Sequence, residues 1–285
     1  MEQLVLAPEQ RRQTVLDLLD SARRSVILSL FRCDDSRVLD RIVATARRGT
    51  DVRVLVTPRA RGWTKRLGSL VMLLKDTGDD VHQYDGPWSK YHAKYIVVDG
   101  ETAAVGSMNL TRKCFDETCD FVLVTNQPDI VSGLMRLYEA DRYTPGEPTP
   151  RLSERLIVGP ENSRARMLGL LESAARSIRI IDHRLSHPEI LLTIARKSKD
   201  GVRVEIRGRG EVAEFVSHGK LILIDDRIAV VGSASLSRAG LDVRREVSVV
   251  IDDPEKIAGL TDFFERISAA PLSGNLEVVE DEDED

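Results

Sequence analysis

Cysteine is scarce in this sequence, which contains only Cys33, Cys114 and Cys119. An odd number of cysteines, without paired Cys-x-x-Cys clusters, excludes a disulfide framework or a zinc module as the element that organises the fold. We expect reduced thiols, with a metal or redox role of Cys114 and Cys119 as the alternative.

Long apolar runs are also missing, because no stretch approaches the roughly 20 residues that cross a bilayer. The first residues, MEQLVLAPEQRRQ, lack the basic flank and the apolar core of a secretion signal. We therefore expect a cytoplasmic protein with at most peripheral membrane contact.

The negative charge of the chain is concentrated in one segment. The formal net charge is -5, but residues 277–285, EVVEDEDED, hold seven acids and no base. The remaining 41 bases and 39 acids nearly balance, so overall charge neither demands nor excludes a nucleic-acid partner. Such a run is typical of a disordered solubilising tail, and an autoinhibitory tail that mimics a polyanion is the alternative.

What the sequence does contain is an internal duplication. Residues 8–56 and 160–206 are similar, and the prolines of YTPGEPTPRLSE between the copies mark a connector. We expect a first half at 1–144, a linker at 145–155, a second half at 156–272 and the acidic tail at 273–285. Six positions recur at a constant offset of 152: Leu16, Leu19, Ser21, Ala22, Arg24 and Ser25 return as Leu168, Leu171, Ser173, Ala174, Arg176 and Ser177.

Each half alternates helices and strands. A helix with apolar residues at helical spacing precedes a β-rich segment, at 25–31 and again at 177–181. A second helix, at 36–49 or 188–201, ends in a glycine that can adopt the left-handed conformation, and another strand follows. Strand, helix, strand in this order implies parallel pairing through a crossover. Three more strand-like runs and a final helix complete each half.

The sequence therefore predicts an α/β fold of two tandem α/β sandwich halves, related by a pseudo-twofold axis, with mixed sheets flanked by helices. Residues 61–90 add a helix and a strand to the first half, where the second half has only GRGEVAEFV. The apolar run LGSLVMLL in this insertion predicts a packed helix, with a membrane-touching surface as the alternative.

A short motif with a histidine and a lysine occurs in both halves. YHAKYIVVDGETAAVGSMNLT is followed 126 residues later by SHGKLILIDDRIAVVGSASLS. Alternate side chains of a strand share a face, so His92 points the same way as Lys94, and His218 the same way as Lys220. If the pseudo-twofold axis brings both strands together, two imidazoles and two ammonium groups form a pocket suited to a phosphate. One histidine can then attack phosphorus while the other protonates the leaving oxygen.

An acid enters an apolar strand 28 residues after each histidine: Asp120 in the first half and Glu246 in the second. A buried carboxylate is costly without a partner. A carboxylate that accepts from an imidazole N–H fixes the tautomer of the ring and stabilises its charged form. We expect these two acids to hold the two histidines, with ordinary strand-edge acids as the alternative.

The pattern His-x-Lys-x4-Asp-x6-Gly-Ser-x-Asn resembles the signature of the phospholipase D superfamily. With the duplicated flanks, the resemblance covers nearly the whole chain and implies a phospholipase D-like fold. The first copy is His92, Lys94, Asp99, Gly106, Ser107 and Asn109, and the second is His218, Lys220, Asp225, Gly232 and Ser233, with a departure at Ser235.

The resemblance implies an enzyme, a metal-independent phosphodiesterase or phosphatidyltransferase that forms a covalent phosphohistidine without a cofactor. It implies His92 as the nucleophile and His218 as the general acid and then the base. Because both motifs lie in one chain, no dimer is needed to complete the site. We expect the motif aspartates to be structural. The residues implied to bind or support phosphate oxygens are Lys94, Lys220, Asn109, Ser107 and Ser233.

Ser235 replaces an asparagine that would donate an amide N–H to a phosphate oxygen. Losing one transition-state donor costs roughly 10²-fold in rate, about 3 kcal/mol. Serine keeps a hydroxyl donor of shorter reach, so we expect a phosphate-supporting role and a weakened rather than disabled site. A degenerate member that binds phosphodiesters without turnover is the alternative.

The motif leaves the substrate open between a nucleic-acid backbone and a phospholipid head group. GSMNLT lacks the Asn-x-Asp-x-Arg continuation associated with cardiolipin synthases, which counts against that branch. Basic loops at the carboxyl ends of strands could meet either substrate. The short second half suggests an open groove near His218, which slightly favours nucleic acid. The basic candidates are Arg59, Arg61, Lys65, Arg66, Arg207 and Arg209.

Overall fold

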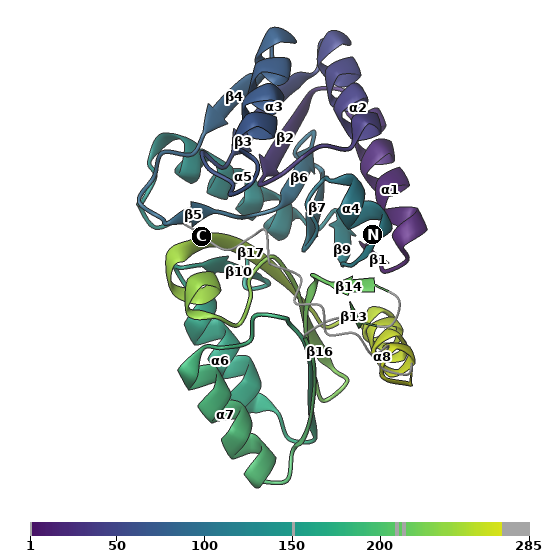
Figure 1. Cartoon of the computed structure of the whole chain (residues 1–285), viewed down its shortest axis with the longest axis vertical. Helices are drawn as coiled ribbons and strands as arrows, with labels where there is room; N and C mark the ends of the chain where they lie inside the picture. The colour runs from purple at the N-terminus through teal and green to yellow at the C-terminus, as the bar shows by residue number, and fades with distance from the viewer. Residues whose placement is uncertain (1, 150–151, 209–210, 213–214, 270–285) are drawn as a thin grey trace.

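A computed structural model of the protein describes residues 2–149, 152–208, 211–212 and 215–269. Figure 1 shows two units, each a sheet with helices on its outer face, with the first unit in the upper part of the view. Arg209 and the acidic tail expected at 273–285 lie outside the described residues.

The first unit contains a mixed sheet with the strand order β1-β9-β7-β6-β2-β3-β4. β2, β3 and β4 pair in parallel, as the strand–helix–strand pattern predicts, and the other neighbours are antiparallel. The elements are β1 (Glu2–Val5), α1 (Pro8–Ser21), β2 (Ser25–Leu30), α2 (Ser36–Arg47), β3 (Asp51–Val56), α3 (Thr64–Asp76), β4 (Asp80–Gln83), β5 (Lys90–Tyr91), β6 (Tyr95–Val98), β7 (Thr102–Gly106), α4 (Arg112–Asp116), β8 (Thr118–Cys119), β9 (Val122–Thr125) and α5 (Pro128–Tyr143).

The second unit repeats this plan with the order β10-β17-β16-β15-β11-β12. β11 and β12 are parallel, and β10 pairs antiparallel with the last strand, as β1 does in the first sheet. Neither of these short edge strands, β1 and β10, is predicted from the sequence. The elements are β10 (Leu156–Gly159), α6 (Ser163–Ser173), β11 (Ser177–Ile181), α7 (Pro188–Lys199), β12 (Arg203–Arg207), β13 (Glu211–Val212), β14 (Phe215–Ser217), β15 (Lys220–Ile224), β16 (Ile228–Gly232), the π-helix η1 (Ala239–Val243), β17 (Arg244–Ile251) and α8 (Pro254–Ala269).

Local signals close the crossover helices where the sequence predicts. Gly49 follows α2 with φ of 86° and Gly201 follows α7 with φ of 91°, a conformation that costs glycine little. Asp35 caps α2 by accepting from the backbone N–H of Val38 at 3.2 Å. These caps hold the start of each β3 or β12 strand next to its parallel neighbour.

The predicted packed helix in the insertion is α3. Its side chains Leu67, Leu70 and Leu74 are buried against the first sheet, whereas Met72 and Leu73 are exposed. Within the described ranges, no helix is both long and apolar enough to cross a membrane.

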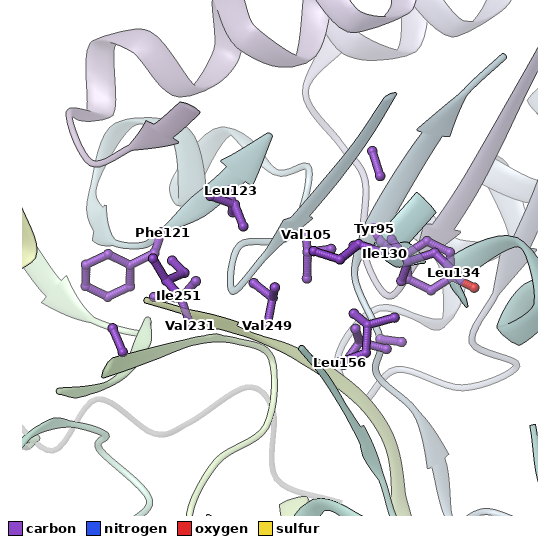
Figure 2. Close-up of a cluster of buried hydrophobic side chains, with 14 of the residues drawn as sticks. Tyr95, Val105, Phe121, Leu123, Ile130, Leu134, Leu156, Val231, Val249 and Ile251 are labelled. Carbon is purple, nitrogen blue, oxygen red and sulfur yellow. The ribbon is translucent and has the colours of Figure 1, made fainter. Parts of the chain in front are cut away.

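One apolar core joins the two units. Inward-facing residues of both sheets pack together, and Figure 2 shows Val105 and Leu123 of the first unit close to Val231 and Val249 of the second. α5 and α8 contribute to the same core, while α1, α2 and α3 cover the first sheet and α6 and α7 cover the second. The halves therefore form a continuous interface that fixes the geometry between their motifs.

The two motif aspartates are structural, as expected. Asp99 accepts hydrogen bonds from three successive backbone N–H groups at the start of β2, at 2.7 to 2.9 Å. Asp225 does the same at the start of β11. Each has φ of 55°, in the turn that ends its strand. They tie the motif strand to its neighbour rather than facing the phosphate pocket.

A buried ion pair also crosses between the units. Arg245 of β17 has no exposed surface, and its guanidinium lies 2.8 Å from Asp141 of α5 and 2.9 Å from Glu161. Burial raises the pKa of Asp141 to about 7 although the charge of Arg245 opposes this shift. The arginine thus places one buried positive charge between two acids at the junction.

Replacing Arg245 by leucine should lower the free energy of unfolding by about 3–5 kcal/mol, because Asp141 loses its cation in a buried place. Urea unfolding followed by circular dichroism measures the loss. Arg196→Leu is the control, since Arg196 pairs with Glu172 on the exposed faces of α7 and α6 and surface pairs contribute about 0–1 kcal/mol. Equal midpoints for the two variants would contradict the assignment.

Candidate active site

Two short parallel strand pairs join the two units through backbone hydrogen bonds. β5, just before the first motif, pairs with the start of β17, with Lys90 opposite Arg244. β14, just before the second motif, pairs with β8, with Val216 opposite Thr118. Because these four positions are related by the duplication offset of 126, the two pairings are pseudo-twofold equivalents. His92 is thereby brought to β17 of the second half, and His218 is brought to β8 of the first half.

The histidines and acids pair across the halves. Nδ1 of His92 lies 2.9 Å from both carboxylate oxygens of Glu246, and Nδ1 of His218 lies 2.8 Å from Oδ1 of Asp120. The spacing of 28 residues between histidine and acid in each half predicts which acids hold the histidines. It does not predict that each acid holds the histidine of the other half. An ionised carboxylate only accepts hydrogen bonds, so Nδ1 of His218 donates to Asp120, and Nδ1 of His92 donates to Glu246 when that acid is ionised.

Asp120 is fully buried and held in its ionised form. Ser107 donates to its Oδ1 at 2.5 Å, and Thr118 donates to Oδ2. Burial alone would raise the pKa of Asp120, but the charge and hydrogen bond of His218, the charge of Arg11 and the hydrogen bond from Ser107 lower it to about 2. A carboxylate that stays charged at neutral pH stabilises the protonated form of His218.

Glu246 is in a different electrostatic state. Burial raises the pKa of Glu246 to about 7, and the charges of Lys94, Arg244 and Lys220 only partly offset it. Near neutral pH this carboxylate is only partly ionised, so it stabilises a charged His92 less than Asp120 stabilises a charged His218. The two chemically similar pairs are therefore unequal.

The motif lysines of both halves act on the same carboxylate. The charges of Lys94 and Lys220 both lower the pKa of Glu246, which is itself paired with His92. Nζ of Lys94 donates to the carbonyl oxygen of His92 at 2.7 Å, and Nζ of Lys220 donates to that of His218 at 2.6 Å.

The motif histidines are not inside regular strands, which corrects the expectation. In the first unit the strand begins only at Tyr95, and in the second it begins at Lys220. The backbone N–H of His92 instead donates to the carbonyl of Arg245 in the other unit, at 2.8 Å. The strand is interrupted where the chain crosses between the units. The hydrogen bonds from Lys94 to the carbonyl of His92 and from Lys220 to that of His218 hold the interrupted segment.

An aromatic side chain lies beside each histidine, and neither is among the residues predicted from the sequence. The Phe31 ring is 4.6 Å from that of His92, edge to face, and the His183 ring is 6.4 Å from that of His218. Each is followed by an arginine, Arg32 or Arg184. The two residue pairs are related by the same offset of 152 that relates the repeated halves. This repetition is the signal in the sequence that could have identified them. Cations also gather on Phe31: Arg32, Lys90 and Lys94 lie 5.1 to 5.2 Å from its centroid.

Asn109 is the residue of the first motif for which the resemblance implies phosphate binding. It is buried, and with Arg32 and Lys94 it lines a mostly apolar cavity of about 30 Å³. Its Oδ1 accepts no hydrogen bond from the described residues. Unsatisfied buried polar atoms are uncommon in folded proteins and often mark functional sites.

The serines of the motifs have partners inside the protein. Ser107 accepts from the backbone N–H of Phe121 besides donating to Asp120, and Ser233 accepts from that of Val247 at 2.9 Å. Ser235 is buried and its hydroxyl pairs with that of Ser237 at 2.9 Å. In this arrangement the three hydroxyls stabilise the walls of the site.

Replacing Asn109 by serine, the residue at the equivalent position 235, should lower kcat roughly 10²-fold because one amide donor is lost. Ser235→Ala is the matched control and should change kcat by much less, since its hydroxyl is occupied by Ser237. Steady-state kinetics on any turned-over substrate measures both. Equal losses of kcat in Asn109→Ser and Ser235→Ala would contradict the prediction that position 109 matters more for catalysis than position 235.

The basic candidates are dispersed. Arg59 and Arg61 are exposed on the segment that leads into α3, and Lys65 and Arg66 are exposed in the first turn of that helix. The carbonyl of Arg61 accepts from Arg32 at 3.1 Å, which links this segment to the site. Arg207 is partly buried, with its guanidinium 5.9 Å from the Phe264 ring. The predicted open groove falls on residues 208–216, four of which lie outside the described residues.

Within the described residues, one group has donor atoms close enough to hold a metal ion. Single ligand atoms of Cys114, Asp120 and His218 lie within 4.8 Å of one another. The charge of Arg11 acts on the same carboxylate, and a cation there would compete with it. The three cysteines are free and buried.

A family model described as "Cardiolipin synthase, PLD-like domain" matches residues 15–142 and 206–268. The chain belongs to the phospholipase D-like family. The match includes both histidine motifs, both aligned acids and the first crossover, so the resemblance and fold predicted from the sequence are confirmed.

Several phospholipase D-like relatives have different names. The chain is 23% identical to a polyphosphate kinase of Yersinia pestis, over 92% of this chain and 44% of that protein. It is 30% identical to a cardiolipin synthase of Listeria welshimeri, over 38% of this chain and 22% of that protein. The chain thus spans less than half the length of these relatives.

Solved structures share the fold. A polyphosphate kinase of Porphyromonas gingivalis aligns with a TM-score of 0.75 at 20% identity, over 93% of this chain and 46% of that one. A phosphatidylserine synthase of Haemophilus influenzae aligns with a TM-score of 0.73 at 12% identity, over 94% of this chain and 85% of that one. The phospholipase D-like fold is therefore shown without naming the substrate.

Proposed function

We propose that the protein cleaves a phosphodiester through a covalent phosphohistidine, with His92 as the nucleophile and His218 as the general acid. The observation that carries this proposal is the crossed pairing of two histidines with two acids of unequal pKa. Lys94, Lys220 and Asn109 supply donors for the non-bridging oxygens.

In the first step, Nε2 of His92 attacks phosphorus and the bond to the leaving oxygen breaks. That oxygen takes the Nε2 proton of His218, which ionised Asp120 keeps available. Glu246, once ionised, accepts a hydrogen bond from Nδ1–H of His92, so the proton stays on Nδ1 and the lone pair is on Nε2. In the second step, neutral His218 removes a proton from water, which attacks phosphorus and releases His92.

The exposed basic segment of Arg59, Arg61, Lys65 and Arg66 supports an anionic polymer, such as a nucleic-acid backbone, as substrate. A second candidate, phosphoryl transfer involving a phosphoanhydride, is favoured by the polyphosphate kinase that matches 92% of this chain. Phospholipid hydrolysis or transfer remains the third possibility, supported by the relatives named for cardiolipin and phosphatidylserine.

The test incubates the purified chain, with EDTA present, with single- and double-stranded nucleic acids, a phospholipid panel and polyphosphate. Turnover in one arm names the substrate class. Binding without turnover in every arm would replace the enzyme by a phosphodiester-binding protein. A parallel set without EDTA and with added divalent metal completes the test, and turnover that appears only there and survives loss of both histidines would overturn the mechanism.

A further inference from the structure

β3 of the first sheet and β12 of the second are equivalent strands with different surroundings. β3 lies between β2 and β4 and packs against α3, so Val52 and Val54 are 3% and 0% exposed. Their equivalents at the offset of 152 are Val204 and Ile206 on β12, which is the last strand of the second sheet in the described residues. Ile206 is 40% exposed. A strand that is interior in one half is therefore an edge in the other.

The backbone of β12 directs hydrogen-bonding groups away from its sheet. The N–H of Arg203 and the carbonyl of Arg207 are bonded toward β11. Because the bonding direction alternates along a strand, the backbone groups of Val204 and Ile206 point outward. The carbonyl of Ile206 accepts from the guanidinium of Arg207 at 3.2 Å. Within the described ranges, both groups of Val204 and the N–H of Ile206 are left for a further strand.

Apolar side chains are exposed beside this edge. α7, the helix between β11 and β12, shares a core cluster with both strands through Ile190 and Ile194. On the same helix Leu191 is 43% exposed and Leu192 is 71% exposed. Together with Ile206 they are three of the seven large apolar side chains that are exposed among the described residues. In the first half the place next to the equivalent strand is filled by β4 and α3.

The charges of β12 select one way in which the strand can pair with its own copy. An antiparallel pair centred on Glu205 would place like charges opposite each other, Glu205 on Glu205 and Arg203 on Arg207, which is unfavourable. A pair centred on Ile206 would need the carbonyl that Arg207 already occupies. A pair centred on Val204 instead places Arg203 of each copy opposite Glu205 of the other.

The same arrangement brings the helices of the two copies together. A twofold axis through Val204 and normal to the sheet leaves both α7 helices on the same face. With strands about 4.8 Å apart and α7 lying over β11 and β12, the two helix axes are about 10 Å apart, an ordinary distance for packed helices. The contact can therefore bury exposed leucine side chains of both copies.

We propose that the edge strand β12 binds a second copy of this chain, in an antiparallel pair centred on Val204. The strand of the second copy takes the place that β4 has in the first half, and its α7 takes the place of α3. The interface is independent of the proposed function, because both histidine motifs lie in one chain.

Sedimentation velocity of the full chain tests the association. The chain should show a monomer–dimer equilibrium with a Kd of roughly 1–100 µM, because one strand and one helix make a small interface. Ile206→Lys places a charge on the edge, as natural edge strands do, and should raise the Kd at least roughly 10-fold. Met72→Lys changes a 66% exposed side chain of α3 and should leave the Kd unchanged.

An engineered disulfide tests the register. Opposite residues of a hydrogen-bonded antiparallel pair have Cα atoms about 5.5 Å apart, which suits a disulfide. Val204→Cys should therefore form a covalent dimer on mild oxidation, and the three native cysteines are buried. Gln83→Cys, on the exposed edge strand β4 of the first sheet, is the matched control and should stay monomeric.

Circular dichroism checks that each variant is folded, and Arg203→Glu, which would face Glu205 of the second copy, replaces Ile206→Lys if the latter unfolds. A chain that is monomeric up to roughly 1 mM would overturn the proposal and leave the edge to a strand of a different protein. Equal Kd values for Ile206→Lys and Met72→Lys would also overturn it. Covalent dimers of Gln83→Cys without those of Val204→Cys would move the contact to the other sheet.

Discussion

Glutamine in place of His92 is expected to lower kcat by roughly 10⁵-fold, because the attacking nitrogen is lost and no other group can form the covalent intermediate. Glutamine retains a polar side chain near Glu246, so the buried acid keeps a possible donor. Single-turnover kinetics on the substrate found in the panel measures the loss.

The counterpart His218→Gln separates the two roles. It should slow turnover but leave His92 able to accept the phosphoryl group, so intact-mass spectrometry should detect the adduct in His218→Gln and not in His92→Gln. His82→Gln on β4, where the ring pairs with Asp85, is the control for loss of a histidine. An adduct on the His92→Gln variant would show that another residue attacks.

Asparagine in place of Asp120 is expected to lower kcat roughly 10⁴-fold, since the amide can neither fix the tautomer of His218 nor stabilise its charge. The pH dependence has a definite sign. Asp120 is ionised above about pH 2 and favours protonated His218. Without that charge His218 loses its proton at lower pH, so the alkaline limb of the kcat profile should move to lower pH.

Asp79→Asn is the control for this change, because it neutralises another buried acid whose pKa burial raises to about 6. It should leave the pH profile in place. An alkaline limb that stays where it is in Asp120→Asn would assign the proton donor to a group other than His218.

The sequence predicts the repeats, the crossover helices and the types of functional residue, because each follows a local periodicity or a spacing that occurs in both halves. Asp120 and Glu246 could be identified as partners of histidines from their equal spacing of 28 residues. Their crossed pairing could not be predicted, because it depends on β5 and β14 joining the opposite unit. These strands are two and three residues long, too short for a periodic signal.

Charge at the site was harder still to predict. Lys90 precedes the motif by two residues and looks like an ordinary loop lysine in the sequence. Only its position opposite Arg244 and over the Phe31 ring places it beside His92. The different states of Asp120 and Glu246 likewise depend on neighbours from both halves, such as Arg11, Lys94 and Lys220.

The crossed pairing of histidine and acid has a consequence for how such a chain can evolve. A half on its own contains a histidine and an acid that do not meet, so a lone copy would complete its pairs only by association with a second identical copy. In such a homodimer every substitution appears twice. Fusion of the copies into one gene removes that constraint, and positions such as Lys90 and Val216 can then specialise independently. The differences between the two halves are therefore expected if two identical copies were fused into one chain and then diverged.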